Sequence, residues 1–213
     1  MRSFAGPNGG KLLSLMAHIL VRTILLIVIT LSSFLAAGCS GLFGDPYDQA
    51  NYYVDEANKA IDVHNRLFEE ARGTYEKAKE SVESTEASSK GNSRETTVQQ
   101  AENITQARET MEGARDALDE AREPLSEVQD LDVEEEIIQY SMLLSESVNA
   151  QIRAENREID FYALLEEDPT LSDDRREAED ILTEVGDGYK EANDDYNRAQ
   201  DLAAANPDLL QES

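Results

Sequence analysis

Residues 50–82 read ANYYVDEANKAIDVHNRLFEEARGTYEKAKESV, and one regular series of positions runs through this segment. The series advances by alternating steps of four and three, which is the spacing of one narrow face of an α-helix. Alternate members are mostly small, and the others are large. The ten members are Ala50, Val54, Ala57, Ile61, His64, Phe68, Ala71, Tyr75, Ala78 and Val82. Because all but His64 are apolar or aromatic, we predict an amphipathic helix that packs closely along a partner.

Similar series occur in three further segments of the chain. The second series is Ile104, Ala107, Met111, Ala114, Leu118, Ala121, Leu125 and Val128. A third, broader and less regular, is Val133, Ile137, Ile138, Leu144, Val148, Ile152 and Ile159. The fourth returns to the strict spacing with Ala178, Leu182, Val185, Tyr189, Ala192, Tyr196, Ala199 and Ala203. We therefore predict helices over residues 46–83, 93–130, 132–167 and 172–206.

Prolines and acidic residues suggest where these helices begin and end. Asp45 followed by Pro46 is typical of a helix start, and Asp132 with Glu135 fits a capping pattern for the third helix. Pro124 interrupts the second series, so we expect a kink or a new start of the helix there. Helix stops are predicted at Asp168-Pro169 and at Asn206-Pro207.

These predictions combine into one fold class. Helices of nearly equal length joined by short connections favour antiparallel neighbours. We expect an all-α, elongated antiparallel bundle with coiled-coil-like heptads, most simply of four helices, over residues 46–206, followed by a tail at 207–213. A three-helix bundle or two helical hairpins are the alternatives if Pro124 redirects the chain.

The N-terminal segment has the organisation of an export signal. Residues 23–35 form an uncharged, apolar run of 13 residues that follows Arg22 and precedes small residues. The run is shorter than the roughly 20 residues of a membrane-spanning helix. Residues 1–38 are long for a signal peptide, and Met16 offers a later start.

The junction Leu35-Ala36-Ala37-Gly38-Cys39 resembles the lipobox of prokaryotic lipoproteins. It departs from the usual pattern at Ala36, where leucine is commonest. The resemblance covers about 25 residues and implies cleavage before Cys39, with a diacylglycerol on its sulfur. It further implies that residues 39–45 are a lipidated tether, that the membrane is a partner, and that the protein lies on the extracytoplasmic face of the cell membrane.

Composition excludes several classes of function. The chain carries a formal charge of −26, and residues 39–213 hold 16 basic against 45 acidic side chains. Such a chain lacks the basic surface that nucleic-acid binding needs. A single cysteine excludes an internal disulfide framework and a thiolate zinc cluster. Acid-rich, lysine-poor surfaces are typical of proteins from salty settings, where counterions screen self-repulsion.

Carboxylates are the commonest reactive groups, and three runs stand out at residues 134–136, 173–174 and 194–195. Consecutive acids on a helix point in different directions, so we predict solvated faces and not a metal site. The chain has no EF-hand loop, no Glu-x-x-His pair of the di-iron type, no glycine-rich phosphate loop and no nucleophile elbow. We predict no catalytic residue, cofactor or metal ligand.

The remaining candidates are His64, three seam tyrosines and two glycines. His64 occupies a core position without an evident partner, so we predict that it fills the seam and sets the register, with a ligand-binding or pH-sensing role as the alternative. The seam tyrosines are predicted to fill the core with their hydroxyls in water, or else to line a ligand site; they are Tyr75, Tyr189 and Tyr196. Gly186 and Gly188 are expected to weaken the fourth helix.

The leading hypothesis is a lipid-anchored, non-enzymatic protein of the cell envelope that acts as a structural or partner-binding helical module. The alternative is a bundle that binds or senses a small molecule or cation between its helices. A cavity beside Tyr189, Gly186 and Gly188 would favour the alternative, whereas a filled seam would favour the first hypothesis.

Overall fold

The computed structural model describes residues 45–87, 93–169, 171, 173–207 and 209. Every regular element in these ranges is an α-helix, and residues 38–213 form a compact unit by themselves. The helices are α2 (Pro46–Ala87), α3 (Ser93–Asp119), α4 (Arg122–Gln129), α5 (Glu135–Glu167) and α6 (Arg175–Ala205). The predicted all-α bundle is confirmed.

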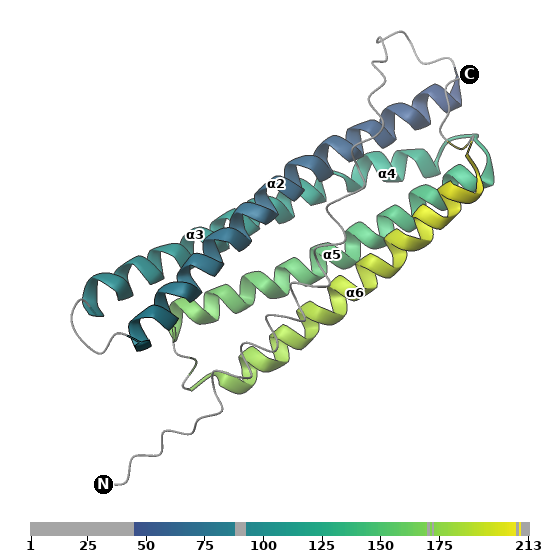
Figure 1. The fold of residues 1–213 in the computed structure, drawn as a ribbon. Helices are drawn as coiled ribbons and strands as arrows, with labels where there is room; N and C mark the ends of the chain where they lie inside the picture. The colour runs from purple at the N-terminus through teal and green to yellow at the C-terminus, as the bar shows by residue number, and fades with distance from the viewer. Residues whose placement is uncertain (1–44, 88–92, 170, 172, 208, 210–213) are drawn as a thin grey trace. The chain divides into compact units, whose positions relative to one another are not determined.

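The helices pack as two antiparallel hairpins (Figure 1). In the first hairpin α2 runs beside α3 and then α4, and in the second α5 runs beside α6. The hairpins meet where α5 contacts both α3 and α4. Because α3 and α4 follow one another along α2, they act as one interrupted helix. The described part of the chain therefore has the architecture of a four-helix bundle.

The interruption in the second helix lies one turn before Pro124. Glu120 and Ala121 form the break, where the Ala121 amide donates to the Leu118 carbonyl at 3.1 Å, a three-residue step. Pro124 then lies in the first turn of α4, where a missing amide hydrogen leaves no helical bond unmade. Its ring would clash with the carbonyl four residues back, which is that of Glu120. The chain restarts without being redirected.

The start of α2 follows the prediction, and the start of α5 does not. The carboxylate of Asp45 accepts a hydrogen bond from the Tyr47 amide at 2.9 Å. The expected capping by Asp132 is wrong, because α5 begins at Glu135 and its N-cap, Glu134, has an extended backbone and makes no side-chain cap bond. Asp132 lies too far upstream of this helix to cap it.

The last helix begins later than expected. Its first residue is Arg175, after Asp174, and Ser172 lies outside the described residues. At their C-terminal ends α5 and α6 stop before Asp168 and Asn206, each followed by proline. These stops agree with the steric restriction on a residue before proline.

The core on one half of the bundle is apolar. We call this cluster the apolar layer; it contains Ala57, Leu118, Ala121, Leu125, Leu143, Leu144, Val148 and Ala199. A second cluster closes the end where α2 begins and consists of Ala50, Val54, Val128, Ile137 and Leu209. The series predicted for α3 and α4 is buried at every position. Val82, the last member of the α2 series, lies outside the described side chains.

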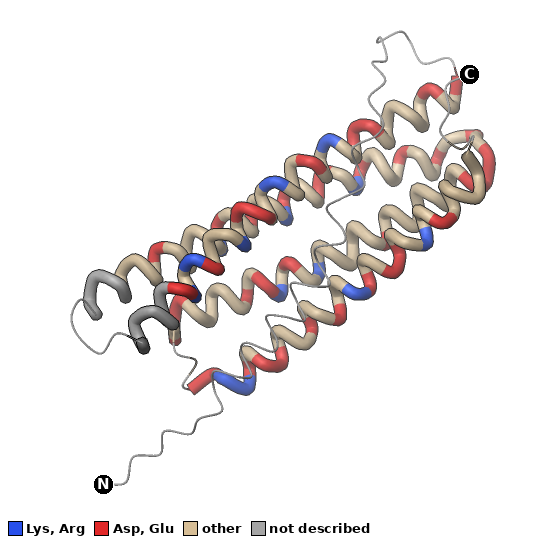
Figure 2. The backbone as a smooth tube through the Cα atoms, in the orientation of Figure 1, with Lys and Arg blue, Asp and Glu red and all other residues tan. Residues whose placement is uncertain are grey.

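The surface is acidic along every helix (Figure 2). Basic residues are fewer, and several form ion pairs that link neighbouring helices. Arg108 of α3 pairs with Glu166 of α5 at 3.0 Å, and Arg153 of α5 pairs with Glu191 of α6 at 2.9 Å. Pairs as exposed as Arg153–Glu191 each contribute only about 0–1 kcal/mol, so the core decides stability.

Candidate functional site

The predicted lipid-attachment residue, Cys39, lies outside the described residues, so its lipidation stays a prediction. Within the described ranges, no helix has the length and apolar character needed to cross a membrane.

His64 lies in the core, as predicted, but it also has a buried partner that the sequence did not indicate. Its side chain is 1% exposed, and Nε2 lies 2.6 Å from Oε1 of Glu155 on α5, which is fully buried. The amide of Gln151, one turn earlier on α5, donates to the same carboxylate oxygen at 3.0 Å and lies 3.1 Å from His64 Nε2. The imidazole therefore joins the first hairpin to the second.

The other nitrogen of His64 also faces oxygen. Nδ1 lies 3.0 Å from Oδ1 of Asn65. A neutral imidazole has only one N–H donor, whereas the imidazolium has two. With the side-chain amide of Asn65 in this orientation, an imidazolium would have a donor for each oxygen, and its contact with Glu155 would then be a buried ion pair.

Glu158 is the second buried carboxylate of α5, and two phenols donate to it. The Tyr162 hydroxyl lies 2.7 Å from Oε1, and the Tyr189 hydroxyl of α6 lies 2.7 Å from Oε2. Burial first, and then the negative charge of Glu158, raise the pKa of both phenols well above the ordinary value of 10. The phenols are therefore held as donors. The expectation of a solvated hydroxyl is wrong for Tyr189.

The other two seam tyrosines lie at the edge of this region or outside it. The ring centres of Tyr75 and Tyr162 lie 5.1 Å apart, and burial raises the pKa of the Tyr75 phenol. Tyr196 is half-buried beside the apolar layer, and its hydroxyl accepts a bond from Gln200 at 2.9 Å. Of the seam tyrosines, Tyr189 bonds to a buried carboxylate, that of Glu158.

Arg72 of α2 brings a second cation. Its guanidinium carbon lies 5.5 Å from the centre of the Phe68 ring, a cation–π distance. The positive charge lowers the pKa of Tyr162 and Tyr189, against the larger effects of burial and Glu158. Within the described residues, Arg72 Nη1 and Glu155 Oε2 are both buried without a hydrogen-bond partner. Such atoms are costly, so each marks a place where the core is imperfectly neutralised.

We call this region the polar layer; it contains His64, Arg72, Gln151, Glu155, Glu158, Tyr162 and Tyr189. Its cations come from the first hairpin, and its carboxylates come from the second. The layer can therefore bind protons and hold the two hairpins in one register.

Sequence reasoning missed Glu155 and Glu158 because the α5 series was traced through apolar residues only. Ile137, Leu144 and Val148 of that series are buried, and its other members are half-buried. The strict three-four step across α5 gives Ile137, Ser141, Leu144, Val148, Gln151, Glu155, Glu158, Tyr162 and Leu165. Holding the step constant through polar residues would have placed both carboxylates in the core.

Gly188 has a packing role that helix propensity did not predict. A Cβ atom there would lie 2.9 Å from Ala154 Cβ, so the glycine lets α6 approach α5. At Gly186 nothing lies within 4 Å of such an atom. The space beside Gly188 and Tyr189 is therefore filled by Ala154 and Glu158.

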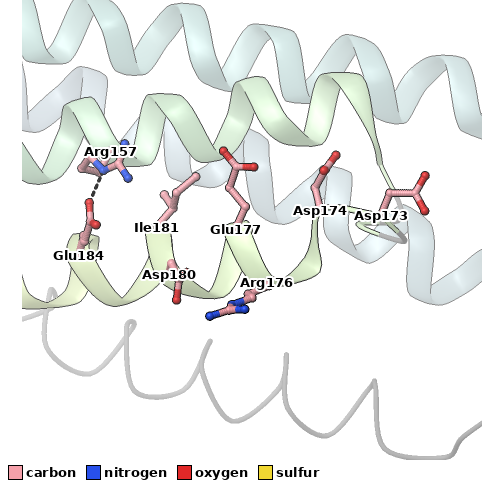
Figure 3. A pocket seen from close by; sticks show the side chains of 8 residues that line it. All are labelled: Arg157, Asp173, Asp174, Arg176, Glu177, Asp180, Ile181 and Glu184. Carbon is pink, nitrogen blue, oxygen red and sulfur yellow. Dashed lines mark hydrogen bonds and ion pairs between the residues drawn. The ribbon is translucent and has the colours of Figure 1, made fainter.

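An open depression of about 490 Å³ lies at the start of α6, beside Arg157 of α5 (Figure 3). It is lined by Arg157, Asp173, Asp174, Arg176, Glu177, Asp180, Ile181 and Glu184. Arg157 pairs with Glu184, and Asp180 and Glu177 point in opposite directions. Over the described residues, no three His, Cys, Asp or Glu side chains converge to hold a metal ion.

Comparison of the chain with family models, curated proteins and solved structures found no match. The function must therefore be argued from the residues themselves.

Proposed function

We propose that this chain is a lipid-anchored protein of the prokaryotic cell envelope, in which the helical bundle is a non-enzymatic structural or partner-binding module. The position of Cys39 carries the proposal. It is the only cysteine, it follows the apolar run at residues 23–35 and the small residues behind that run, and it precedes α2 by seven residues. A lipidation site is expected at this place between a signal peptide and a folded domain.

The mechanism is tethering. Acyl chains on Cys39 contribute about 0.8 kcal/mol for each buried CH₂ group, and two chains suffice for stable anchoring. The seven residues from Cys39 to Pro46 reach at most about 25 Å. The lipid would hold the start of α2 within that distance of the bilayer, and the acidic helical faces would be available to partners in the envelope.

The packing of the second hairpin supports this role over the binding of a small molecule between helices. The alternative predicted a cavity beside Tyr189, Gly186 and Gly188. The space beside Gly188 and Tyr189 is occupied by Ala154 and by the carboxylate of Glu158, whereas nothing lies within 4 Å of a Cβ atom placed on Gly186. The core there is used for contacts between helices.

The test is the substitution Cys39→Ser in the native host, with Ser40→Ala as the matched control. We expect Cys39→Ser to leave an uncleaved precursor or a secreted form without the mass of the lipid, and Ser40→Ala to behave as the wild type. A Cys39→Ser protein with wild-type membrane fraction and wild-type mass would refute the anchor. With the intact lipidated protein as bait, affinity capture from membranes then tests the partner-binding role.

A further inference from the structure

We propose that the polar layer is a pH-sensitive switch, in which protonation of His64 controls how firmly the two hairpins dock. This inference goes beyond the proposed anchoring function and does not depend on it.

The charges of the layer are divided between the two hairpins. His64 and Arg72 come from α2, whereas Glu155 and Glu158 come from α5. With His64 as the imidazolium, a cation from the first hairpin faces the buried carboxylate of Glu155 in the second. With His64 neutral, that ion pair is lost. One proton on His64 therefore decides whether the charge of Glu155 is balanced at the contact between the hairpins.

The contacts inside each hairpin do not need that proton. The buried residues along α2 and α3 include several alanines and the larger Val54, Phe68, Ile104, Met111 and Leu118. In the second hairpin, Ala154 packs on Gly188. Loss of the proton should therefore weaken the docking of the hairpins more than the hairpins themselves.

The helices of the bundle bring several charged or titratable groups to this region. From α2 there is Arg72, and from α5 there are Glu155 and Glu158. From α6 there is Tyr189, whose raised pKa keeps it neutral. From α3 there is Arg115, which donates to Asn156 of α5 at 3.0 Å. The short helix α4 contributes to the apolar clusters through Leu125 and Val128.

His64 is the one member of this set whose residue type ordinarily changes charge between about pH 5 and pH 8. It is also the only histidine in residues 39–213, because His18 precedes Cys39. The charge change therefore has a single histidine as its source in the part of the chain that contains the bundle.

The direction of the effect follows from the burial of Glu155. When His64 loses its proton, Glu155 stays buried opposite a neutral ring, and an uncompensated buried charge is strongly destabilising. Docking should therefore be firmest at mildly acidic pH, where the pair can carry both charges, and should weaken toward pH 8. At still lower pH, protonation of the carboxylates removes the same pairing.

The experiment is hydrogen exchange of the buried α5 and α6 amides in the purified protein from about pH 5 to pH 8, corrected for the intrinsic pH dependence of exchange. NMR of the His64 ring follows its titration in the same samples. We expect the closed-to-open equilibrium constant to fall about ten- to a hundredfold as His64 loses its proton. The charge-neutral variants His64→Gln and Glu155→Gln should lose this dependence. The matched control, Glu136→Gln at an exposed position on α5, should keep it.

Single variants of a buried pair can fail to fold, so the paired variant His64→Leu with Glu155→Leu completes the test. We expect it to fold and to show no change across the same pH range, because both charges are replaced by apolar groups. The proposal is overturned if the wild-type constant does not change while His64 titrates. It is equally overturned if either His64→Gln or the paired variant keeps the wild-type pH dependence.

Discussion

The apolar layer and the polar layer lie one heptad apart on the same helix faces, and they use opposite chemistry. His64 follows Ala57 by seven residues on α2, and Glu155 follows Val148 by seven on α5. Both layers are buried and both join the two hairpins. The periodicity of the chain therefore determines which positions face the core, and the residue type determines whether a layer supplies burial energy or a specific, charge-dependent contact.

The largest difference between the layers should appear when one partner of the buried pair is removed. His64→Leu leaves Glu155 buried and unpaired, so we expect the free energy of unfolding to fall by about 3–5 kcal/mol. Burial alone, without the partner, would predict an unchanged or increased stability. Urea denaturation at about pH 6 measures the change, and a variant as stable as the wild type would mean that Glu155 is not held by the imidazole.

A truncation in the apolar layer should cost less and should not depend on pH. Leu125 is fully buried, and Leu125→Ala leaves a cavity that we expect to lower the free energy of unfolding by about 2–4 kcal/mol. The control Met142→Ala, at an exposed position, should change it by less than about 0.5 kcal/mol. A Leu125→Ala cost that varies between about pH 5 and pH 8 would show that the two layers are not separable.

Alkaline pH should weaken both layers through their tyrosines. Burial raises the pKa of Tyr140, beside the apolar layer, to about 12, and burial together with the charge of Glu158 raises the pKa of Tyr162 and Tyr189 well above 10. A raised folded-state pKa means that the contribution to stability is present below about pH 10 and is lost as the pH rises toward the folded value. Each such phenol should lower the free energy of unfolding by about 1.4 kcal/mol per pH unit above 10.

Urea denaturation at a series of pH values above 10 measures this loss, and tyrosinate absorbance reports the ionisation of the phenols. In Tyr189→Phe the free energy of unfolding should fall less steeply with pH, because one buried phenol is absent. Ionisation of the Tyr189 phenol in the intact fold near pH 10 would contradict the raised pKa that burial and Glu158 give it.

The smallest effect concerns the packing of the second hairpin. Gly188→Ala forces a Cβ atom against Ala154, so we expect a net loss of about 1 kcal/mol despite the better helix propensity of alanine. Gly186→Ala, two residues away and unobstructed, should instead gain up to about 1 kcal/mol. Melting temperatures of the two variants compare them directly, and equal gains would show that α5 and α6 do not approach closely at Gly188.

Much of the fold could be predicted from the sequence, because the three-four step survives in α2, in α3 with α4, and in α6. The break before Pro124 was displaced by one turn, since the proline clashes backwards with Glu120 while fitting the first turn of the next helix. The candidate site was found only in part. The sequence identified His64, because it is the one residue of its series that is neither apolar nor aromatic. It did not identify the partner Glu155, because a carboxylate at a core position interrupts an apolar pattern and is not counted as part of it.

The central claim is that His64 and Glu155 act as one unit across the hairpin contact, and a double-mutant cycle tests it most directly. The four proteins are the wild type, His64→Leu, Glu155→Leu and the paired variant, with the free energy of unfolding measured for each at about pH 6. We predict that each single change costs about 3–5 kcal/mol and that the paired change costs far less than their sum. Additive costs, with no coupling between the two positions, would contradict the account.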